Sequence, residues 1–321
     1  MLSKSASPPL VSVRVITYNH EAFLRQCLEG IFMQQTDFPF EVVIGEDCST
    51  DGTRVICEEY RTRYPEVVTL LMHQQNVGAQ ENARRTREAC KGKYIALCEG
   101  DDYWTDPLKL QKQATFLEEN GEFTLCFHNC YVRHETAPSE TQELFQHYSK
   151  DIYGIQDLFG KWLIPTASVM FRNHLFEDYP DWLRNAIVGD TPFYILIASF
   201  GKIKLLPGVM GVYRRHPGGA TNFLHGYHYW ERMIELYTGM DEYFEFRYRN
   251  EINPVLEWFH YKLAQIAFKK HDYEKYKLYA RRCVRRDRKL LLQYRYLGMY
   301  MASYAPALFK VYSRIKSSSV Q

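Results

Sequence analysis

The 321-residue chain is long enough for one large domain or for one domain with an appendage, and its 46% apolar and 24% charged residues are ordinary for a globular protein. Its formal net charge is only +2, from 40 basic and 38 acidic residues, so no overall field favours a nucleic-acid partner. No apolar stretch reaches about 18 residues, and we therefore expect no transmembrane helix.

Cysteine usage and the N-terminus both indicate a cytoplasmic protein. The eight cysteines form no CxxC pair and match no zinc-ligand spacing, so we expect reduced thiols. Residues 1–9 are Ser-rich and lack the apolar core of a signal peptide, and we predict that they are disordered.

Short apolar runs alternate with amphipathic segments over the first 110 residues. The pattern predicts strands and helices in turn, with strands at 11–17, 40–45, 67–72 and 94–98 and helices at 21–34, 51–63 and 80–90. Strands that alternate with helices of this length predict an α/β fold with a doubly wound, mostly parallel sheet.

The pattern is less regular beyond this sheet. It predicts a helix at 107–120, a strand at 123–132, a loop at 134–150, an interrupted helix at 178–200 and a strand–turn–strand at 202–213. From about Tyr227 onward only helices are predicted. We therefore expect one domain over 10–225 and an α-helical C-terminal extension over 226–321.

Polar residues follow each of the first four predicted strands, where an open parallel sheet binds its ligands. They are Thr17-Tyr18-Asn19-His20, Glu46-Asp47-Cys48-Ser49-Thr50-Asp51-Gly52-Thr53, Asn76-Val77-Gly78 and Glu99-Gly100-Asp101-Asp102. Either acidic segment alone is also typical of an ordinary turn. Two acidic strand ends together favour a hard divalent cation, Mg²⁺ or Mn²⁺, that bridges to a phosphate. The absence of GxGxxG after the first strand and of GxxxxGK[ST] disfavours dinucleotide and P-loop sites.

The ordered series of these segments resembles family 2 glycosyltransferases, which are inverting enzymes with the GT-A fold. The resemblance is close over about 110 residues and looser as far as His216. It implies a nucleotide-binding half over 10–110 and an acceptor half over 111–225. It also implies transfer of a sugar from a UDP- or dTDP-sugar donor to a saccharide or lipid-linked acceptor, with Mg²⁺ or Mn²⁺ as cofactor.

The resemblance also implies which residues bind the nucleotide-sugar. Thr17 and Tyr18 would line the base and ribose pocket, Asp47 would bond the base, and Asn82, Arg84 or Arg85 would flank the base or diphosphate. Glu99-Gly100-Asp101 occupies the family's Asp-x-Asp position, with Glu in place of the first Asp. The implied set is Thr17, Tyr18, Asn19, Asp47, Asn76, Arg84, Glu99, Asp101 and Arg214.

Three residues are implied as metal ligands: Asp101 and His216 directly, and Asp102 in a supporting position. His216 lies in a Tyr-Arg-Arg-His segment, and its alternative interpretation is an ordinary loop residue. Arg214 of the same segment would neutralise the leaving phosphate.

Asp190, in Val188-Gly189-Asp190-Thr191-Pro192, resembles the family's catalytic carboxylate and would deprotonate the acceptor. Its alternative role is that of a helix N-cap. Asp178 and Asp181 are second choices as the base. Trp104 is equally compatible with sugar stacking and with core burial, and the resemblance places 164–168 beside the acceptor cleft.

Basic residues dominate 275–289, and an aromatic stretch follows at 290–309. The pattern is compatible with a peripheral contact to an anionic membrane, with an ordinary packed helix, or with a dimer contact. Two other functions are alternatives to this transfer. A degenerate GT-A module would bind nucleotide-sugar or glycan without catalysis, and a sugar-1-phosphate nucleotidyltransferase is disfavoured because the first strand lacks a Gly-rich basic loop after it.

Overall fold

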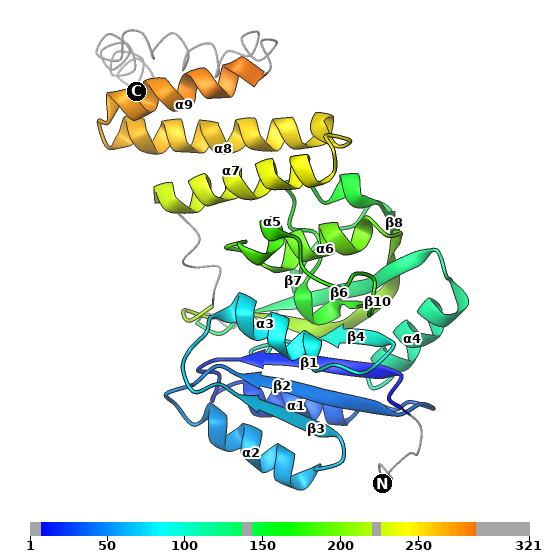
Figure 1. Ribbon diagram of the computed structural model, residues 1–321. Helices are drawn as coiled ribbons and strands as arrows, with labels where there is room; N and C mark the ends of the chain where they lie inside the picture. The colour runs from blue at the N-terminus through cyan, green and yellow to red at the C-terminus, as the bar shows by residue number, and fades with distance from the viewer. Residues whose placement is uncertain (1–7, 137–142, 220–225, 287–321) are drawn as a thin grey trace. The chain divides into compact units, whose positions relative to one another are not determined.

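The computed structural model describes residues 8–136, 143–219 and 226–286 (Figure 1). The chain divides into two compact units, one of Met1–Tyr179 with Val188–Gly219 and one of Pro180–Ile187 with Ala220–Gln321. The second unit therefore includes 180–187, which the sequence-based division placed in the larger domain. The predictions for residues 1–7 and for the aromatic stretch 290–309 lie outside the described residues.

The first unit is built on one mixed sheet with the strand order β3-β2-β1-β4-β9-β6-β10-β5. Its first half is parallel and consists of β1 (Val11–Thr17), β2 (Phe40–Glu46), β3 (Val68–Met72) and β4 (Tyr94–Leu97). These strands confirm the predicted ones to within one residue at each end. Their near-continuous apolar runs are typical of parallel strands that are covered on both faces.

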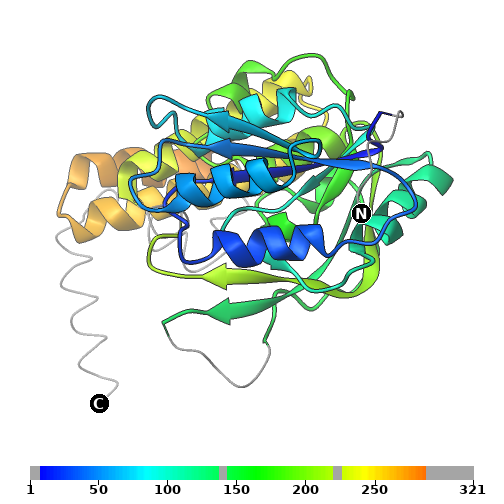
Figure 2. The same ribbon diagram turned by 90° about the horizontal axis from the view of Figure 1, so that it is seen from below.

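Helices cover both faces of these strands. They are α1 (Leu24–Phe32), α2 (Thr53–Arg63) and α3 (Ala79–Glu88). Figures 1 and 2 show α1 and α2 on one face of the sheet and α3 on the other. The doubly wound α/β arrangement is thereby confirmed, and it brings the carboxyl ends of β1, β2 and β4 to one edge.

The second half of the sheet mixes directions. β9 (Met170–Arg172) runs antiparallel between β4 and β6 (Phe123–His134), and β10 (Lys202–Arg215) runs parallel to β6. Short strands complete it: β5 (Tyr103–Trp104) and β8 (Ile152–Tyr153) pair with β10, and β7 (Glu143–Leu144) pairs with β6.

Two predictions for this half were wrong. The expected strand–turn–strand at 202–213 is one strand, β10, whose register shifts between Leu205 and Val209. Gly208 lies there with a φ of 96°, so the Pro207-Gly208 pair makes a bulge and does not reverse the chain. The expected loop at 134–150 contains β7 among its described residues.

The interrupted helix expected at 178–200 consists of two helices, α5 (Asp181–Arg184) and α6 (Asp190–Ala198). The break falls before α6, whose N-cap is Gly189, and Pro192 lies inside α6. α4 (Lys109–Glu119) confirms the helix expected at 107–120. Two 3₁₀ turns, Ile155–Asp157 and Thr166–Ser168, lie between β8 and β9.

The second unit is helical over its described residues, as predicted from Tyr227 onward. α7 (Gly226–Tyr243), α8 (Arg249–Lys269) and α9 (Tyr273–Arg286) follow one another, with α8 packed against both neighbours. Among the residues that the structure describes, no helix combines the length and the apolar character needed to span a bilayer.

Candidate active site

The loops after β1 and β2 are tied together by side chains. Asn19 Oδ1 accepts the Thr50 N–H at 2.8 Å, and the Asn19 N–H donates to Ser49 Oγ at 3.0 Å. Asn19 has a φ of 54°, a conformation that Asn tolerates better than most residues. The predicted nucleotide ligand Asn19 therefore holds the loop, while the neighbouring Tyr18 is 42% exposed and available to a ligand.

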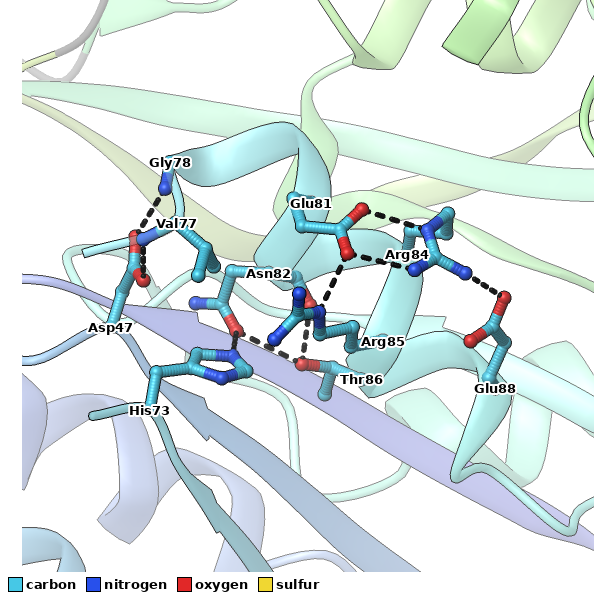
Figure 3. Close-up of polar contacts among 10 residues, drawn as sticks. All are labelled: Asp47, His73, Val77, Gly78, Glu81, Asn82, Arg84, Arg85, Thr86 and Glu88. Atoms are coloured by element: carbon cyan, nitrogen blue, oxygen red, sulfur yellow. Dashed lines mark hydrogen bonds and ion pairs between the residues drawn. The ribbon is translucent and has the colours of Figure 1, made fainter. Parts of the chain in front are cut away.

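Asp47 holds the loop after β3. Its Oδ1 accepts the Val77 N–H at 2.7 Å and its Oδ2 accepts the Gly78 N–H at 3.0 Å (Figure 3). Asn76 Oδ1 also accepts the Gly78 N–H, at 3.1 Å. A carboxylate has about four acceptor positions, so Asp47 keeps capacity for a further donor such as a base N–H.

The three α3 residues named as alternatives have different surroundings. Asn82 is buried, and its Nδ2 donates to Gly45 O at 2.9 Å, which is a structural contact. Arg84 donates to Glu81 and Glu88 in an ion-pair network on the helix surface, and Arg85 joins it through Glu81 (Figure 3). A phosphate would have to compete with Glu81 for either arginine.

The acidic turn after β4 lies directly against the end of β1. Gly100 N–H donates to Ile16 O at 2.9 Å. A Cβ at Gly100 would lie 2.7 Å from Thr17 Oγ1 and 2.9 Å from His20 Nδ1. Only glycine allows this approach, which brings Asp101 beside the loop after β1.

Three potential metal donors meet at this point. His216 Nε2 lies 3.1 Å from Asp101 Oδ2, and His20 Nε2 lies 3.8 Å from the same oxygen. One ligand atom from each residue lies within 4.8 Å of the other two. Burial lowers the pKa of His20, against the opposing effect of Asp101, and so favours the neutral imidazole that binds metals. Two imidazole nitrogens and one carboxylate oxygen are donors that Mn²⁺ accepts, so these residues fit a divalent cation.

The structure thus brings the predicted ligands Asp101 and His216 together and adds His20. In the sequence, His20 belongs to a polar strand-end segment, and it was not predicted as a ligand. Its position three residues after Thr17 was the available signal, but that spacing does not show which way a loop side chain turns.

Asp102 lies apart from these three donors. It is 1% exposed, and its Oδ1 accepts the Arg214 backbone N–H at 2.8 Å. Burial and the neighbouring Asp101 carboxylate raise the pKa of Asp102. Its position supports the acidic turn from behind and does not add a fourth donor to the group.

Arg214 is a buried clamp on the same turn. Its guanidinium donates to Asp101 O at 2.6 Å, to Glu135 Oε1 at 3.0 Å, and to Gln26 Oε1. Arg214 is only 4% exposed. These bonds attach β10 and α1 to the acidic turn. To bind a phosphate, Arg214 would have to use a remaining N–H donor or exchange one of these bonds.

Glu99 interacts electrostatically with both the predicted metal ligand Asp101 and the predicted base Asp190. Burial and the carboxylates of Asp101 and Asp190 raise its pKa to about 8, against the opposing effect of Arg14. The raised pKa favours the protonated form of Glu99, which can act as a hydrogen-bond donor.

Asp190 is the first residue of α6, and Gly189, not Asp190, is the N-cap. Its Oδ1 accepts the Thr191 N–H at 2.7 Å, and its Oδ2 accepts the indole N–H of Trp162 at 3.2 Å. Burial raises its pKa, against these hydrogen bonds. A Cβ on Gly189 would overlap the Gln80 side chain, so the start of α6 abuts the start of α3.

The remaining predicted residues fall outside this group. Asp181 belongs to the other unit, and Asp178 accepts the adjacent Tyr179 N–H at 2.7 Å. Trp104 is 2% exposed and donates to Ala167 O at 2.7 Å, so core burial is the correct one of its two interpretations. The segment 164–168 is buried.

Comparisons with known proteins identify the family and the fold of the chain. A family model described as Glycosyl transferase family 2 matches residues 12–179. The uncharacterized protein Rv1520 of Mycobacterium tuberculosis is 39% identical over 209 residues, which span 65% of this chain but only 60% of that relative.

Two solved structures share the fold. The structure of TarS residues 1–349 from S. aureus with UDP-GlcNAc has a TM-score of 0.62 and 19% identity, covering 92% of this chain and 89% of that one. A mannosyltransferase from Pyrobaculum calidifontis, PcManGT, with GDP-Man and Mn²⁺ has a TM-score of 0.53 and 15% identity, covering 95% and 87%. These likenesses place the first unit in the GT-A fold.

Proposed function

The chain belongs to glycosyl transferase family 2, and on that premise we propose that it transfers a sugar from a nucleotide diphosphate-sugar to an acceptor hydroxyl with inversion at the anomeric carbon. One observation carries the proposal. Asp101, His216 and His20 meet at the sheet edge where the loops after β1, β2 and β3 also end. Ligands of open α/β sheets bind at this edge.

The nucleotide would occupy the side of the edge formed by the β1–β3 loops. Tyr18 is exposed there, and Asp47 keeps acceptor capacity for the N3–H of uracil or thymine. We therefore propose UDP- or dTDP-sugars as donors. Glu99, whose raised pKa favours the protonated form, can donate to a ribose or phosphate oxygen.

His20, Asp101 and His216 are the residues that would hold Mg²⁺ or Mn²⁺. When bound, such an ion supplies positive charge to a departing diphosphate. PcManGT, a protein with this fold, was solved with Mn²⁺. Arg214 keeps the acidic turn in place through its bond to Asp101 O.

Asp190 would act as the general base. The acceptor oxygen forms a bond to the anomeric carbon as the bond from that carbon to the diphosphate oxygen breaks, and the acceptor proton moves to Asp190. Burial raises the pKa of Asp190, which strengthens it as a proton acceptor once it is ionised. The Thr191 and Trp162 hydrogen bonds orient its carboxylate.

Thermal unfolding of the full chain with Mn²⁺ and a panel of UDP-, dTDP- and GDP-sugars tests the donor. A donor at 100 to 1,000 times its dissociation constant stabilises the folded state by about 2.7–4.1 kcal/mol. Release of nucleotide diphosphate from the stabilising donor then tests the activity, with Asp101→Ala and Asp190→Ala as inactive controls. Stabilisation without turnover by the wild type would identify the degenerate binding module instead.

We further propose a peripheral membrane contact through the C-terminal helices. On α9 the side chains of Lys275, Arg281 and Arg282 are exposed, whereas Tyr276 and Tyr279 are buried. Exposed basic side chains are attracted to anionic headgroups. We expect the protein to co-sediment with phosphatidylglycerol vesicles but not with phosphatidylcholine vesicles. Sedimentation with neither kind of vesicle would contradict the proposal.

A further inference from the structure

Trp162 is a large aromatic side chain that the fold leaves exposed. It is 40% exposed, although the nearby Phe159 and Ile164 on either side of it are 5% and 2% exposed. The adjacent carbonyl of Leu163 accepts the Tyr148 hydroxyl at 2.7 Å. Anchors on both sides therefore fix the segment, and the exposure of the indole is a property of the folded loop.

Two further rings hold the indole in place. The ring centroid of Trp162 lies 4.9 Å from that of Phe145 and 5.5 Å from that of Tyr213, and Phe145 and Tyr213 lie 5.6 Å apart. All three pairs are edge-to-face, with interplanar angles of 82°, 79° and 87°. We call Phe145, Trp162 and Tyr213 the aromatic trio. Such perpendicular packing is a preferred aromatic geometry and fixes the plane of the indole.

The polar edge of the indole points at the proposed base. Trp162 Nε1 donates to Asp190 Oδ2 at 3.2 Å, and Asp190 Oδ1 is occupied by the Thr191 N–H. A group that lies over the exposed indole is therefore next to the carboxylate that would receive the acceptor proton.

The aromatic trio lies on the acceptor half of the sheet. Phe145 follows β7, which pairs with β6, and Tyr213 lies in β10. β6 and β10 stand on the far side of β4 from β1, β2 and β3, whose loops form the proposed nucleotide side (Figure 1). The trio therefore lies on the opposite side of the acidic turn from the proposed nucleotide site.

An exposed indole beside a carboxylate has the chemistry of a pyranose site. The face of an aromatic ring carries partial negative charge, which attracts the C–H groups on the apolar face of a pyranose, while the carboxylate accepts a sugar hydroxyl. An aliphatic chain would use the indole but would have no hydroxyl for the remaining acceptor positions of the carboxylate.

We propose that Trp162 is the acceptor platform: the terminal residue of the acceptor is a pyranose that stacks on the indole and directs the attacking hydroxyl to Asp190. The part of this inference that concerns the attacking hydroxyl rests on the proposed function. The stacking part concerns binding alone and can be tested without turnover.

Saturation-transfer NMR with the full chain, UDP and Mn²⁺ tests the platform, with the methyl pyranosides of glucose, galactose, mannose and N-acetylglucosamine as probes. We expect saturation of the ring protons on one face of at least one pyranoside. Trp162→Ala should weaken binding of that pyranoside about tenfold, the size of one strong ring contact, and Trp162→Phe should restore most of it.

Trp258 provides the matched control, because it is also 40% exposed and lies in α8 of the other unit. Trp258→Ala should leave pyranoside binding unchanged. The inference is overturned if no pyranoside binds the wild type, if Trp162→Ala binds as well as the wild type, or if Trp258→Ala loses binding equally.

The two proposals fail separately. Pyranoside binding that depends on Trp162, without release of nucleotide diphosphate from any donor, would sink the proposed transferase and leave the platform standing. In the converse case, the wild type turns over a donor and the acceptor KM of Trp162→Ala equals that of the wild type. That result would remove the platform and leave the transferase.

Discussion

His216 Nε2 lies 3.1 Å from Asp101 Oδ2, although 115 residues separate the two in the chain. β5 and β10 bring them together, because Tyr103 pairs with Val212 and the chain then runs past the acidic turn. The backbone N–H of Arg214 donates to Asp102 at this crossing. The metal-donor group is therefore a product of strand pairing in the second half of the sheet.

Replacing either residue should weaken metal binding in the free protein. We expect Asp101→Asn and His216→Ala to lower Mn²⁺ affinity by more than the roughly 10- to 100-fold that loss of an outer-shell partner costs. Isothermal titration with Mn²⁺ alone measures this without any donor. The exposed His228 supplies the control, and an unchanged affinity in His216→Ala would exclude His216 as a ligand.

Gly100→Ala should disturb the same group by sterics alone. The new Cβ would lie 2.7 Å from Thr17 Oγ1 and 2.9 Å from His20 Nδ1, so the turn or the His20 ring must shift. We expect Mn²⁺ affinity and activity to fall together. Gly121→Ala is the matched control, because nothing lies within 4 Å of its added Cβ. Equal behaviour of the two variants would show that the close approach has no role.

The first half of the sheet was predictable because each strand is a buried apolar run with a polar end. Runs such as that of β1 are read directly from the sequence, and parallel pairing then brings their polar ends to one edge. β9 was missed because it has three residues and lies inside a longer apolar segment. Its strand character comes from its neighbours β4 and β6, not from its own pattern.

Site residues were predictable where the residue type is unusual for its position in the sequence. They were not predictable where the direction of a loop side chain decides whether it reaches the site. Asp101 stands out as an acid at a strand end. His20 and Trp162 do not, because a loop sequence does not tell whether a side chain turns toward the sheet edge. Arg214 was expected to face a phosphate, yet its guanidinium is held by Gln26, Glu135 and Asp101.

Arg214→Lys should therefore destabilise the fold and not only the reaction. Lysine keeps the charge but lacks the planar fork that reaches three acceptors, and buried acceptors left unpaired cost about 1–3 kcal/mol. Urea unfolding measures the loss. Arg84→Ala, which removes partly exposed ion pairs on α3, should change stability by no more than about 1 kcal/mol. Similar losses in both variants would contradict the clamp.

Asp190→Asn should lower activity and raise stability. Loss of a general base typically reduces the rate by about 10²–10⁴-fold. Burial raises the folded-state pKa of Asp190 above its ordinary 3.8, so the native protein holds this proton more tightly than the unfolded chain. The wild type therefore loses stability as the pH rises from 3.8 through the folded-state pKa. Asparagine does not titrate. The gain in melting temperature should be present at pH 7 and shrink as the pH falls toward 4, and a lower melting temperature at pH 7 would contradict it.

Trp162→Phe separates the indole N–H from the ring. Burial raises the pKa of Asp190, whereas hydrogen bonds from Thr191 and Trp162 lower it. Glu99 and the phenol of Tyr194 also interact electrostatically with Asp190. Removing the indole donor takes away one stabilising contact to the ionised carboxylate, so the pKa of Asp190 rises further. Because the base must be ionised, the acidic limb of the kcat profile should move to higher pH, and the rate should recover above that limb. Profiles measured at saturating Mn²⁺ and donor, with Trp258→Phe alongside, distinguish this from general damage, which would depress the rate at every pH.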